Sequence, residues 1–380
     1  MPDMNDFEIT PGELADRLEG GEPVQVLDVR APHRLASGRV EAERFFNIRG
    51  SEIMSGANPA GAGLDPDTPV AVVCGHGNSS QPVTQYLRMT GWTARSLKGG
   101  VAAWMNLLRQ RVLAPPAEAD RFIQFDRVGK GSLGYLIVSD GEALAVDPSR
   151  DWTAWRDAAR EAGARLVGTV DTHVHADFIS GSPELSRELG VPYHLHPADS
   201  VYPYDGTPGR LAFEPIEQGT VIPIGRAEVR VDHTPGHTEG SVSLHVADDA
   251  VFTGDFLFVA SIGRPDLAGK TEEWTGALWE SLVRTRETWP AEAVVYPAHY
   301  GSDAERNADL SVGRPLADLV AGNPTLSIET EAEFRETVRR HASTPPEVYR
   351  TIKAINVGLR NVTPEEAQVL EAGKNECALG

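Results

Sequence analysis

Three short segments that carry histidine and aspartate constrain this 380-residue chain more than any other feature. They read THVHADF at residues 172–178, HTPGHTEGS at 233–241 and TGD at 253–255. Imidazole nitrogens and carboxylate oxygens are ligands of borderline transition metals. A fold that uses all three segments must bring distant parts of the chain together around one metal ion, and we expect such an arrangement here.

The position of each segment predicts where the metal centre lies. Residues 164–170 are apolar and predict a strand that ends just before the first segment. His173 and His175 would then lie on a loop at the rim of a sheet, where proteins commonly build their sites. A second apolar strand is expected directly before Asp255, and His237 is the candidate ligand of the middle segment.

The length of 380 residues suits two or three domains, each with its own core. Adjacent prolines at positions 115 and 116 can neither continue a helix nor join a central strand, so the stretch around them is typical of a linker. We therefore expect a first domain over residues 1–112, a linker over 113–121 and a second domain over 122–380. A polar, helical pattern predicts a helical extension at the end of the second domain, with the last few residues frayed.

The net charge and the cysteine content indicate which partners and which cellular location to expect. The net charge of −20 is spread along the chain without a basic cluster, which argues against nucleic acid and anionic membranes as partners. No apolar run approaches the roughly 20 residues that span a bilayer, and the first residues lack a signal-peptide pattern. The two cysteines, Cys74 and Cys377, imply no disulfide framework, so a cytoplasmic location is expected. Cys377, in the terminal KNECALG, is expected to be an incidental exposed thiol.

Local signals predict an α/β arrangement in the first half. Thr10 and Glu13 predict a capping box for a helix over residues 11–19. Apolar runs at 24–29 and 70–74 predict buried parallel strands that alternate with helices.

Cys74 ends the second of these strands and opens the short glycine-rich loop GHGNSS. Backbone N–H groups in such a loop can form a cup for an anion and lower the pKa of a thiol. With LDVR at 27–30 and LKGGVAAW at 97–104, the loop resembles the landmarks of single-domain rhodaneses, in which the cysteine carries sulfane sulfur as a persulfide. The resemblance implies this catalytic role for Cys74. The substrate cradle would then consist of Gly75, His76, Gly77, Asn78 and Ser79.

The loop departs from that family at one position. Thiosulfate-using members commonly place an arginine where this chain has Ser79, and an opposite charge nearby can lower a pKa by roughly one to three units. Cys74 is thus expected to be less activated, and thiosulfate would lose a counter-ion. The alternative is a first domain that binds a partner or senses sulfur without taking part in catalysis.

The second half resembles the metallo-beta-lactamase superfamily, on the three segments above and on YPAHY at 296–300. The resemblance covers residues 120 to about 330 and implies an αββα sandwich. The chain itself predicts a strand meander after the linker, followed by alternating helices and strands, which fits such a sandwich with outer helices.

The number of metals depends on one position. Members of the glyoxalase II type hold two metals through a full HxHxDH motif, but this chain has Phe178 where the last histidine would stand. Phenylalanine cannot donate to a metal. A second ion would retain only Asp177, His299 and a shared Asp255, so one metal per chain is expected.

Persulfide dioxygenases are the sulfur-oxidising branch of the superfamily and hold one iron(II) through two histidines and an aspartate. Carried over by motif, these ligands are His173, His237 and Asp255. Such a facial triad leaves open positions where a substrate sulfur and dioxygen can bind together. His175 would be an outer-shell residue in this branch and a direct ligand in a zinc hydrolase, so its role stays open. His299 is a candidate for second-shell support.

The segment SIGRPDL at 261–267 resembles a glycine–arginine motif of the same branch, whose arginine lies near the thiol cosubstrate. The resemblance implies that Arg264 binds a carboxylate of that cosubstrate. A structural ion pair with Asp266 is the alternative.

Together the resemblances imply a mononuclear iron(II) persulfide dioxygenase with a fused sulfurtransferase-like rhodanese domain. Its substrates would be dioxygen and a low-molecular-weight thiol persulfide, such as glutathione persulfide, and its product would be sulfite, as in sulfide metabolism. A homo-oligomer, either a dimer or a tetramer, is expected from the relatives. The alternative is a zinc-dependent thioesterase of the glyoxalase II type, in which a metal-bound hydroxide attacks an acylated thiol.

Overall fold

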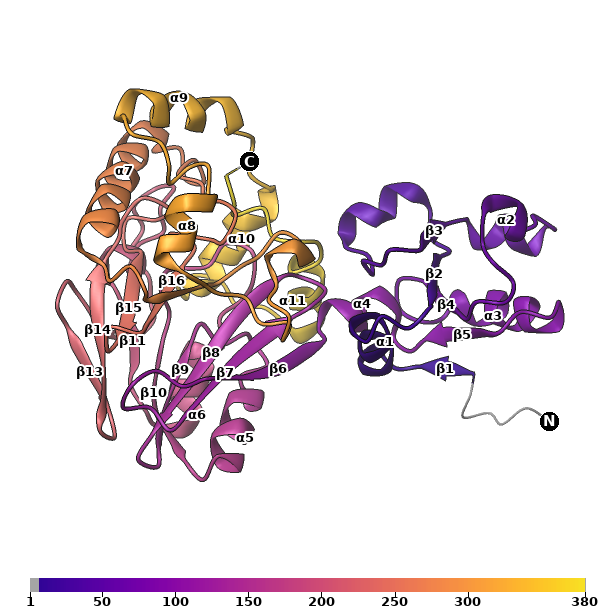
Figure 1. The fold of residues 1–380 in the computed structure, drawn as a ribbon, viewed down its shortest axis with the longest axis horizontal. Coiled ribbons are helices and arrows are strands. Elements are labelled where there is room, and N and C mark those ends of the chain that lie inside the picture. The colour runs from indigo at the N-terminus through magenta and orange to yellow at the C-terminus, as the bar shows by residue number, and fades with distance from the viewer. Residues whose placement is uncertain (1–6, 380) are drawn as a thin grey trace. The chain divides into compact units, whose positions relative to one another are not determined.

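The computed structural model describes residues 7–379, which divide into two compact units (Figure 1). The first unit comprises the described residues up to Arg109, with Arg127–Lys130 and Ala372–Lys374. The second comprises Gln110–Asp126, Gly131–Glu371 and the described residues from Asn375 onward. Within residues 7–379, no helix has both the length and the apolar character that crossing a bilayer requires.

The segment expected as a linker, residues 113–121, belongs to the second unit. Strand β6 (Leu108–Leu113) already joins the seven-stranded sheet of that unit. The backbone N–H of Ala117 donates to the Asp249 carboxylate over 2.7 Å, and Ala119 is buried in the core between the sheets. The paired prolines end the strand, but these contacts hold the segment in place, so it is not a free linker.

A five-stranded parallel sheet forms the first unit. Its strand order is β1 (Glu8–Ile9), β5 (Ala94–Leu97), β4 (Val70–Val73), β2 (Gln25–Asp28) and β3 (Phe45–Asn47). Its helices are α1 (Pro11–Glu19), α2 (Gly50–Met54), α3 (Ser80–Met89) and α4 (Gly100–Met105). Successive side chains of a strand point to opposite faces, so Val26 packs with α1 and α4 while Leu27 packs with α2 and α3. The predicted capping box is confirmed between Thr10 and Glu13.

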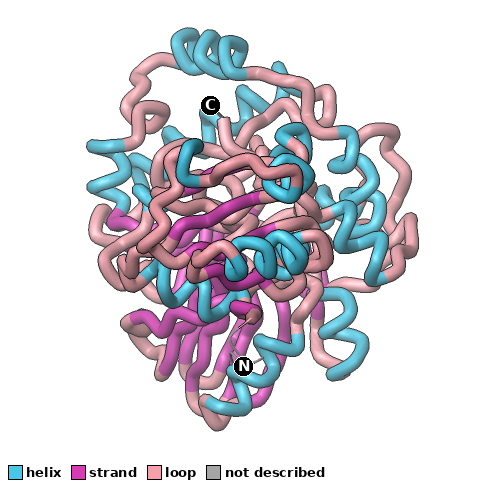
Figure 2. The backbone as a smooth tube through the Cα atoms, turned by 90° about the vertical axis from the view of Figure 1, so that its right-hand side faces the viewer, coloured by secondary structure: helices cyan, strands magenta, loops and turns pink. Residues whose placement is uncertain are grey.

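Two sheets pack face to face in the second unit, with helices outside them (Figures 1 and 2). The first sheet has the order β12 (Glu214–Pro215), β11 (Tyr193–Leu195), β10 (Arg165–Val170), β9 (Glu142–Val146), β8 (Ser132–Ser139), β7 (Arg121–Arg127) and β6. The second has the order β13 (Val221–Ile224), β14 (Ala227–His233), β15 (Val242–Val246), β16 (Ala250–Gly254), β17 (Val294–Pro297) and β18 (Arg314–Pro315). The predicted sandwich, with its meander β7–β8–β9, is confirmed.

Helices cover the outer face of each sheet. The first sheet carries α5 (Thr153–Glu161) and α6 (Ser182–Leu189), which contact β10. The second sheet carries α7 (Thr271–Thr288) and α8 (Leu316–Gly322), and α9 (Glu331–His341) packs on α7. The predicted C-terminal helical extension consists of α9, α10 (Glu347–Asn356) and α11 (Pro364–Leu370).

An aromatic cluster fills the core between the two sheets. The rings of Phe122 and Tyr296 meet edge to face at 4.9 Å between centroids, and those of Tyr135 and Phe252 are tilted at 4.8 Å. On the other face of β16, Val251 packs against residues of α7. Both faces of this strand are buried, and its first three residues, Ala250 to Phe252, are apolar.

Replacement of Phe252 by alanine tests this core. The side chain is fully buried, and its loss leaves a cavity, so we expect the free energy of unfolding of the second unit to fall by about 3–5 kcal/mol. Urea unfolding followed by tryptophan fluorescence measures the change. Val369→Ala, at a side chain that is 74% exposed, is the control and should change stability by less than about 0.5 kcal/mol. A loss near the control value for Phe252→Ala would contradict the placement of this ring.

Candidate metal centre

The histidine and aspartate segments all follow the C-terminal ends of strands. His173 comes after β10, His237 after β14, Asp255 directly after β16 and His299 after β17. Close approach of two of these segments requires a glycine. Gly254 has a φ of +54°, and a Cβ there would lie 2.3 Å from Thr172 Oγ1. The glycine of the TGD segment therefore lets β16 run against the loop that carries His173.

Three side-chain atoms converge at the rim of the two sheets. The Nε2 atom of His173 lies 3.6 Å, and the Nε2 atom of His237 3.5 Å, from Oδ2 of Asp255. All three side chains are buried, and within residues 7–379 none of the three atoms has a hydrogen-bond partner. Metal bonds of about 2.0–2.2 Å place neighbouring ligand atoms roughly 3–3.5 Å apart, which fits these separations. These are the three residues expected from the motifs, and the fold brings them together.

Hydrogen bonds fix which imidazole nitrogen faces inward. The Thr172 hydroxyl donates to Asp147 over 2.8 Å, so it can only accept from Nδ1 of His173, at 3.1 Å. Nδ1 of His237 donates to the backbone carbonyl of Arg264 over 3.0 Å. Each of these hydrogen bonds places the ring proton on Nδ1 and leaves a lone pair at Nε2, which is how hydrogen-bond partners orient metal-ligating histidines.

Protonation also favours metal binding at these atoms. Burial lowers the pKa of His237 well below its ordinary value, so the ring is neutral. Burial raises the pKa of the Asp255 carboxyl, but the charge of His299 outweighs that effect and holds the pKa well below its usual range. Buried polar atoms without partners are costly, and two imidazole nitrogens with one carboxylate oxygen fit a divalent transition metal. The group of His173, His237 and Asp255 is called the triad below.

His175, whose role the sequence left open, lies beside the triad. Its ring centroid is 4.3 Å from that of His173, and its Nε2 lies 3.1 Å from Asp147. Its donor atoms group with those of Asp147 and Asp171, not with the triad. Burial lowers the pKa of His175, but the charge of Asp147 outweighs it and raises the pKa overall. His175 therefore lies in the layer of side chains that supports the triad.

A second group of donors adjoins the triad. His299 lies between two carboxylates, with Nδ1 2.6 Å from Asp255 and Nε2 3.1 Å from Asp177. Although burial lowers it, these carboxylates raise the pKa of His299 to about 10, so the ring is charged at neutral pH. Asp177, His299 and Cys377 place one ligand atom each within 4.8 Å of one another. Phe178 stacks on His175 at 4.1 Å between centroids.

The expectation of an exposed, incidental Cys377 in a frayed end is wrong. The Cys377 side chain is fully buried, and its Sγ lies 3.9 Å from the hydroxyl of Tyr349. The backbone N–H of Arg264 donates to the Cys377 carbonyl over 2.9 Å, and Leu379 donates to Ile262 over 2.8 Å. The tail pairs with the segment after Asp255, and this non-local pairing has no signature in the terminal sequence.

Arg264 does not offer its guanidinium to a cosubstrate. The side chain is buried and pairs with Asp266 over 2.6 Å. It also donates to the backbone carbonyls of Ser343 and Glu376. This geometry corresponds to the structural ion pair, and it contradicts the expectation that Arg264 binds a carboxylate of the substrate, because the donors are already engaged. Arg264 anchors the C-terminal tail instead.

Two residues that sequence analysis missed hold the ligand loops. Asp199, which is buried, accepts from the Val174 N–H at 2.7 Å, the Thr238 hydroxyl at 2.8 Å and the Gly240 N–H at 2.7 Å. It therefore ties the loop of His173 to the loop of His237. The Asn356 amide donates to the carbonyls of His175 and Phe178. Neither residue lies in a recognisable motif, so no local signal could have found them.

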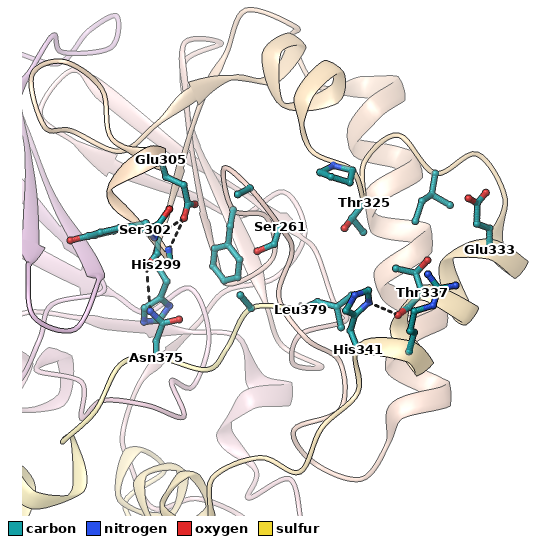
Figure 3. A pocket seen from close by; sticks show the side chains of 18 residues that line it. Ser261, His299, Ser302, Glu305, Thr325, Glu333, Thr337, His341, Asn375 and Leu379 are labelled. Carbon is teal, nitrogen blue, oxygen red and sulfur yellow. Dashed lines mark hydrogen bonds between the residues drawn. The ribbon is translucent and has the colours of Figure 1, made fainter. Parts of the chain in front are cut away.

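Two cavities reach this region. One of about 560 Å³ has His299 and Asn375 at one end and Thr337 and His341 at the other (Figure 3). Exposed Arg340 also lines it. The other, of about 330 Å³, is lined by Val174 and Thr238 from the ligand loops and by buried Lys353. The larger cavity therefore reaches His299, and the smaller one reaches residues next to the triad histidines in the chain.

The loop of Cys74 in the first unit has the form of an anion cup. Within the described residues, the N–H groups of Gly75 to Ser79 have no backbone partner. The Sγ of Cys74 is buried 3.3 Å from the hydroxyl of Ser80, and exposed Ser79 stands next to it at the start of α3. A Cβ on Gly100 would lie 2.3 Å from the Cys74 carbonyl, which explains the glycine pair in LKGGVAAW. The loop brings Cys74 and its cradle together.

Comparison with known proteins decides the family. The profile of the metallo-beta-lactamase superfamily matches residues 128–320, more than half of the chain. The chain belongs to that superfamily. The profile of the rhodanese-like domain matches residues 10–107, so the resemblance of each half to its family is confirmed. The metal centre is thus the expected one for a metallo-beta-lactamase domain.

Three similar proteins give the context of this superfamily member. The mitochondrial persulfide dioxygenase ETHE1 of Bos taurus is 37% identical over 161 residues, which cover 42% of this chain and 59% of that protein. This chain therefore spans less than two thirds of that relative. The probable metallo-hydrolase YqgX of Bacillus subtilis is 29% identical over 43% of this chain and 83% of that protein. A solved metallo-beta-lactamase structure from Staphylococcus aureus is 28% identical, with a TM-score of 0.55, and covers 64% of this chain and 73% of that one.

Asp199→Asn tests the support of the triad. The amide cannot accept all three bonds of the carboxylate, so we expect metal affinity to fall roughly 10- to 100-fold. Competition with a chelator, measured by isothermal titration, gives the affinity. The control is Asp205→Asn, an exposed aspartate on a nearby loop, which should leave affinity unchanged. Equal affinity of Asp199→Asn and the control would show that the loops hold their positions without this carboxylate.

Proposed function

We propose that the second unit is a persulfide dioxygenase with iron(II) in the triad. The observation that carries the proposal is the convergence of two lone-pair-bearing imidazoles and one carboxylate, each buried and without another partner, in a chain similar to a persulfide dioxygenase. In the overall reaction, one thiol persulfide, one dioxygen and one water give one thiol and one sulfite. The terminal sulfur loses four electrons, and dioxygen accepts them.

In this proposal, the protein residues bind the metal ion and the substrate, and they keep water away from the reacting atoms. His173, His237 and Asp255 would hold the ion on one side, leaving positions for substrate on the other. Iron in such a site supplies the redox chemistry that joins sulfur to oxygen. The cavity that ends at His299 is the proposed route for the thiol carrier. Its wall includes Arg340, which can pair with a carboxylate of glutathione, and also the carboxylates of Glu305 and Glu333.

Oxygen uptake tests the proposal. We expect the iron-loaded protein to consume one dioxygen per sulfite released when glutathione persulfide is supplied. The zinc-loaded protein and the iron-treated His237→Ala variant should consume none above background. The control is His194→Ala, because His194 lies on β11 outside the triad; it should keep full activity. No uptake by protein with confirmed iron occupancy would reject the proposal.

A zinc thioesterase of the glyoxalase II type is the second candidate. The donor group of Asp177, His299 and Cys377 favours it, since hydrolysis in that family uses two metals. Hydrolysis of an acylated thiol by the zinc-loaded protein, without oxygen uptake by the iron-loaded protein, would establish this function instead.

For the first unit, we propose that Cys74 transfers sulfane sulfur between small thiols and sulfite. Cys74→Ser should abolish sulfur transfer, measured as thiocyanate formation with cyanide as acceptor, but leave oxygen uptake with added persulfide unchanged. Ser79→Arg should raise the rate with thiosulfate, because the added charge can stabilise both the thiolate and the anion. An unchanged transfer rate in Cys74→Ser would point to the partner-binding alternative.

A further inference from the structure

We propose that the cavity of about 330 Å³ binds a compact sulfur oxyanion through the ammonium of Lys353 and the indole N–H of Trp274. Both side chains line this cavity, one from α10 and the other from α7, and both are at most 3% exposed. The proposed reaction releases such an anion, sulfite. Naming sulfite therefore rests on the proposed function, whereas the anion site rests on these two side chains.

Lys353 belongs to the buried face of α10. This face also carries Tyr349, Ile352 and Asn356, at the spacing that places side chains on one side of a helix. Such a face is ordinarily apolar, and lysine is almost never fully buried unless it is paired. Within residues 7–379, however, no hydrogen bond or ion pair engages the Lys353 ammonium. The helix therefore brings an unpaired donor group to the cavity wall.

Trp274 supplies a second donor of the same kind. Its side chain is buried, and its Nε1 atom has no hydrogen-bond partner among the described residues. An ammonium and an indole N–H can donate hydrogen bonds but cannot accept them. Buried donors without partners are costly, so this cavity favours a ligand that offers acceptor oxygens. An oxyanion such as sulfite or sulfate meets this requirement.

The other charged groups on the cavity wall already have partners or face solvent. Lys270 pairs with Glu239 over 3.2 Å. Asp199 accepts the three hydrogen bonds that hold the ligand loops. Asp205 accepts from a backbone N–H over 2.9 Å and is exposed, so solvent screens its charge. Among the described residues of the wall, Lys353 is thus the cation that remains for an entering anion.

Lys353 also lies within electrostatic reach of the triad. Burial lowers the pKa of its amine, while the carboxylates of Asp199 and Asp255 oppose that effect. An anion beside the amine would stabilise the charged form. The same cavity wall includes Val174 and Thr238, which follow the triad histidines in the chain. The cavity that ends at His299 stays the route of the thiol carrier, and this cavity is the route of the oxyanion.

Isothermal titration of the full-length, zinc-loaded protein with sulfite, and separately with sulfate, tests the site. We expect both anions to bind, and we expect Lys353→Met to raise each dissociation constant at least about tenfold, because a charge-assisted hydrogen bond is lost. Lys270→Met is the matched control, since Lys270 lines the same cavity but is paired and partly exposed. Its dissociation constants should stay within about twofold of the unchanged protein.

Two outcomes of this titration would overturn the proposal. One is the absence of binding to the unchanged protein. The other is equal binding by Lys353→Met and Lys270→Met, which is the result expected if zinc alone holds the anion. Acetate is the probe for a carboxylate ligand and should bind more weakly than sulfate. Tighter binding of acetate would overturn the assignment to a sulfur oxyanion.

Trp274→Phe covers the case in which Lys353→Met does not fold. The substitution keeps an aromatic ring and removes the N–H, so the dissociation constant for sulfate should rise roughly 2- to 10-fold. The control is Trp279→Phe, on the same helix but packed against Phe334, which should leave the constant unchanged. Equal constants for the two variants would contradict the role of the indole N–H. These titrations need neither persulfide nor dioxygen, so the anion site and the proposed oxygenase reaction can fail independently.

Discussion

One buried carboxylate sets the geometry on which the metal centre depends. Asp199 accepts three hydrogen bonds from two loops that follow strands of different sheets. This common acceptor links the loop of His173 to the loop of His237, while Nε2 of each histidine has no hydrogen-bond partner within the described residues. Burying these polar atoms without hydrogen bonds costs free energy, which the packing of the surrounding fold offsets. Donor atoms held in this way are ready to bind a metal ion.

The local features of this chain could be predicted because their causes are local. The capping box of Thr10 and Glu13 involves residues three apart, and the strands before Cys74 and His173 are apolar runs buried on two faces. The placement of ligands at a sheet rim followed from the strand that precedes them. Each of these inferences requires only neighbouring residues and the periodicity of a strand or helix.

The parts that sequence analysis missed depend on contacts between distant segments. Asp199, Asn356 and Cys377 act through bonds to loops far away along the chain, and nothing in their own neighbourhoods marks them. The role of Arg264 could not be predicted from its own segment either. SIGRPDL is compatible both with a substrate contact and with an ion pair to Asp266. The tail favours the ion pair, because the Glu376 carbonyl accepts a hydrogen bond from the guanidinium of Arg264, which is buried.

His299 connects the triad with the group that contains Cys377. The Asp255 carboxylate directs Oδ2 toward the two triad histidines and Oδ1 toward His299, so a single side chain is shared by both groups. Any change of charge at His299 therefore acts on the triad through one carboxylate, over a few ångströms of buried, low-dielectric protein where screening by salt is weak. This shared carboxylate gives the C-terminal tail a direct electrostatic path to the proposed iron site.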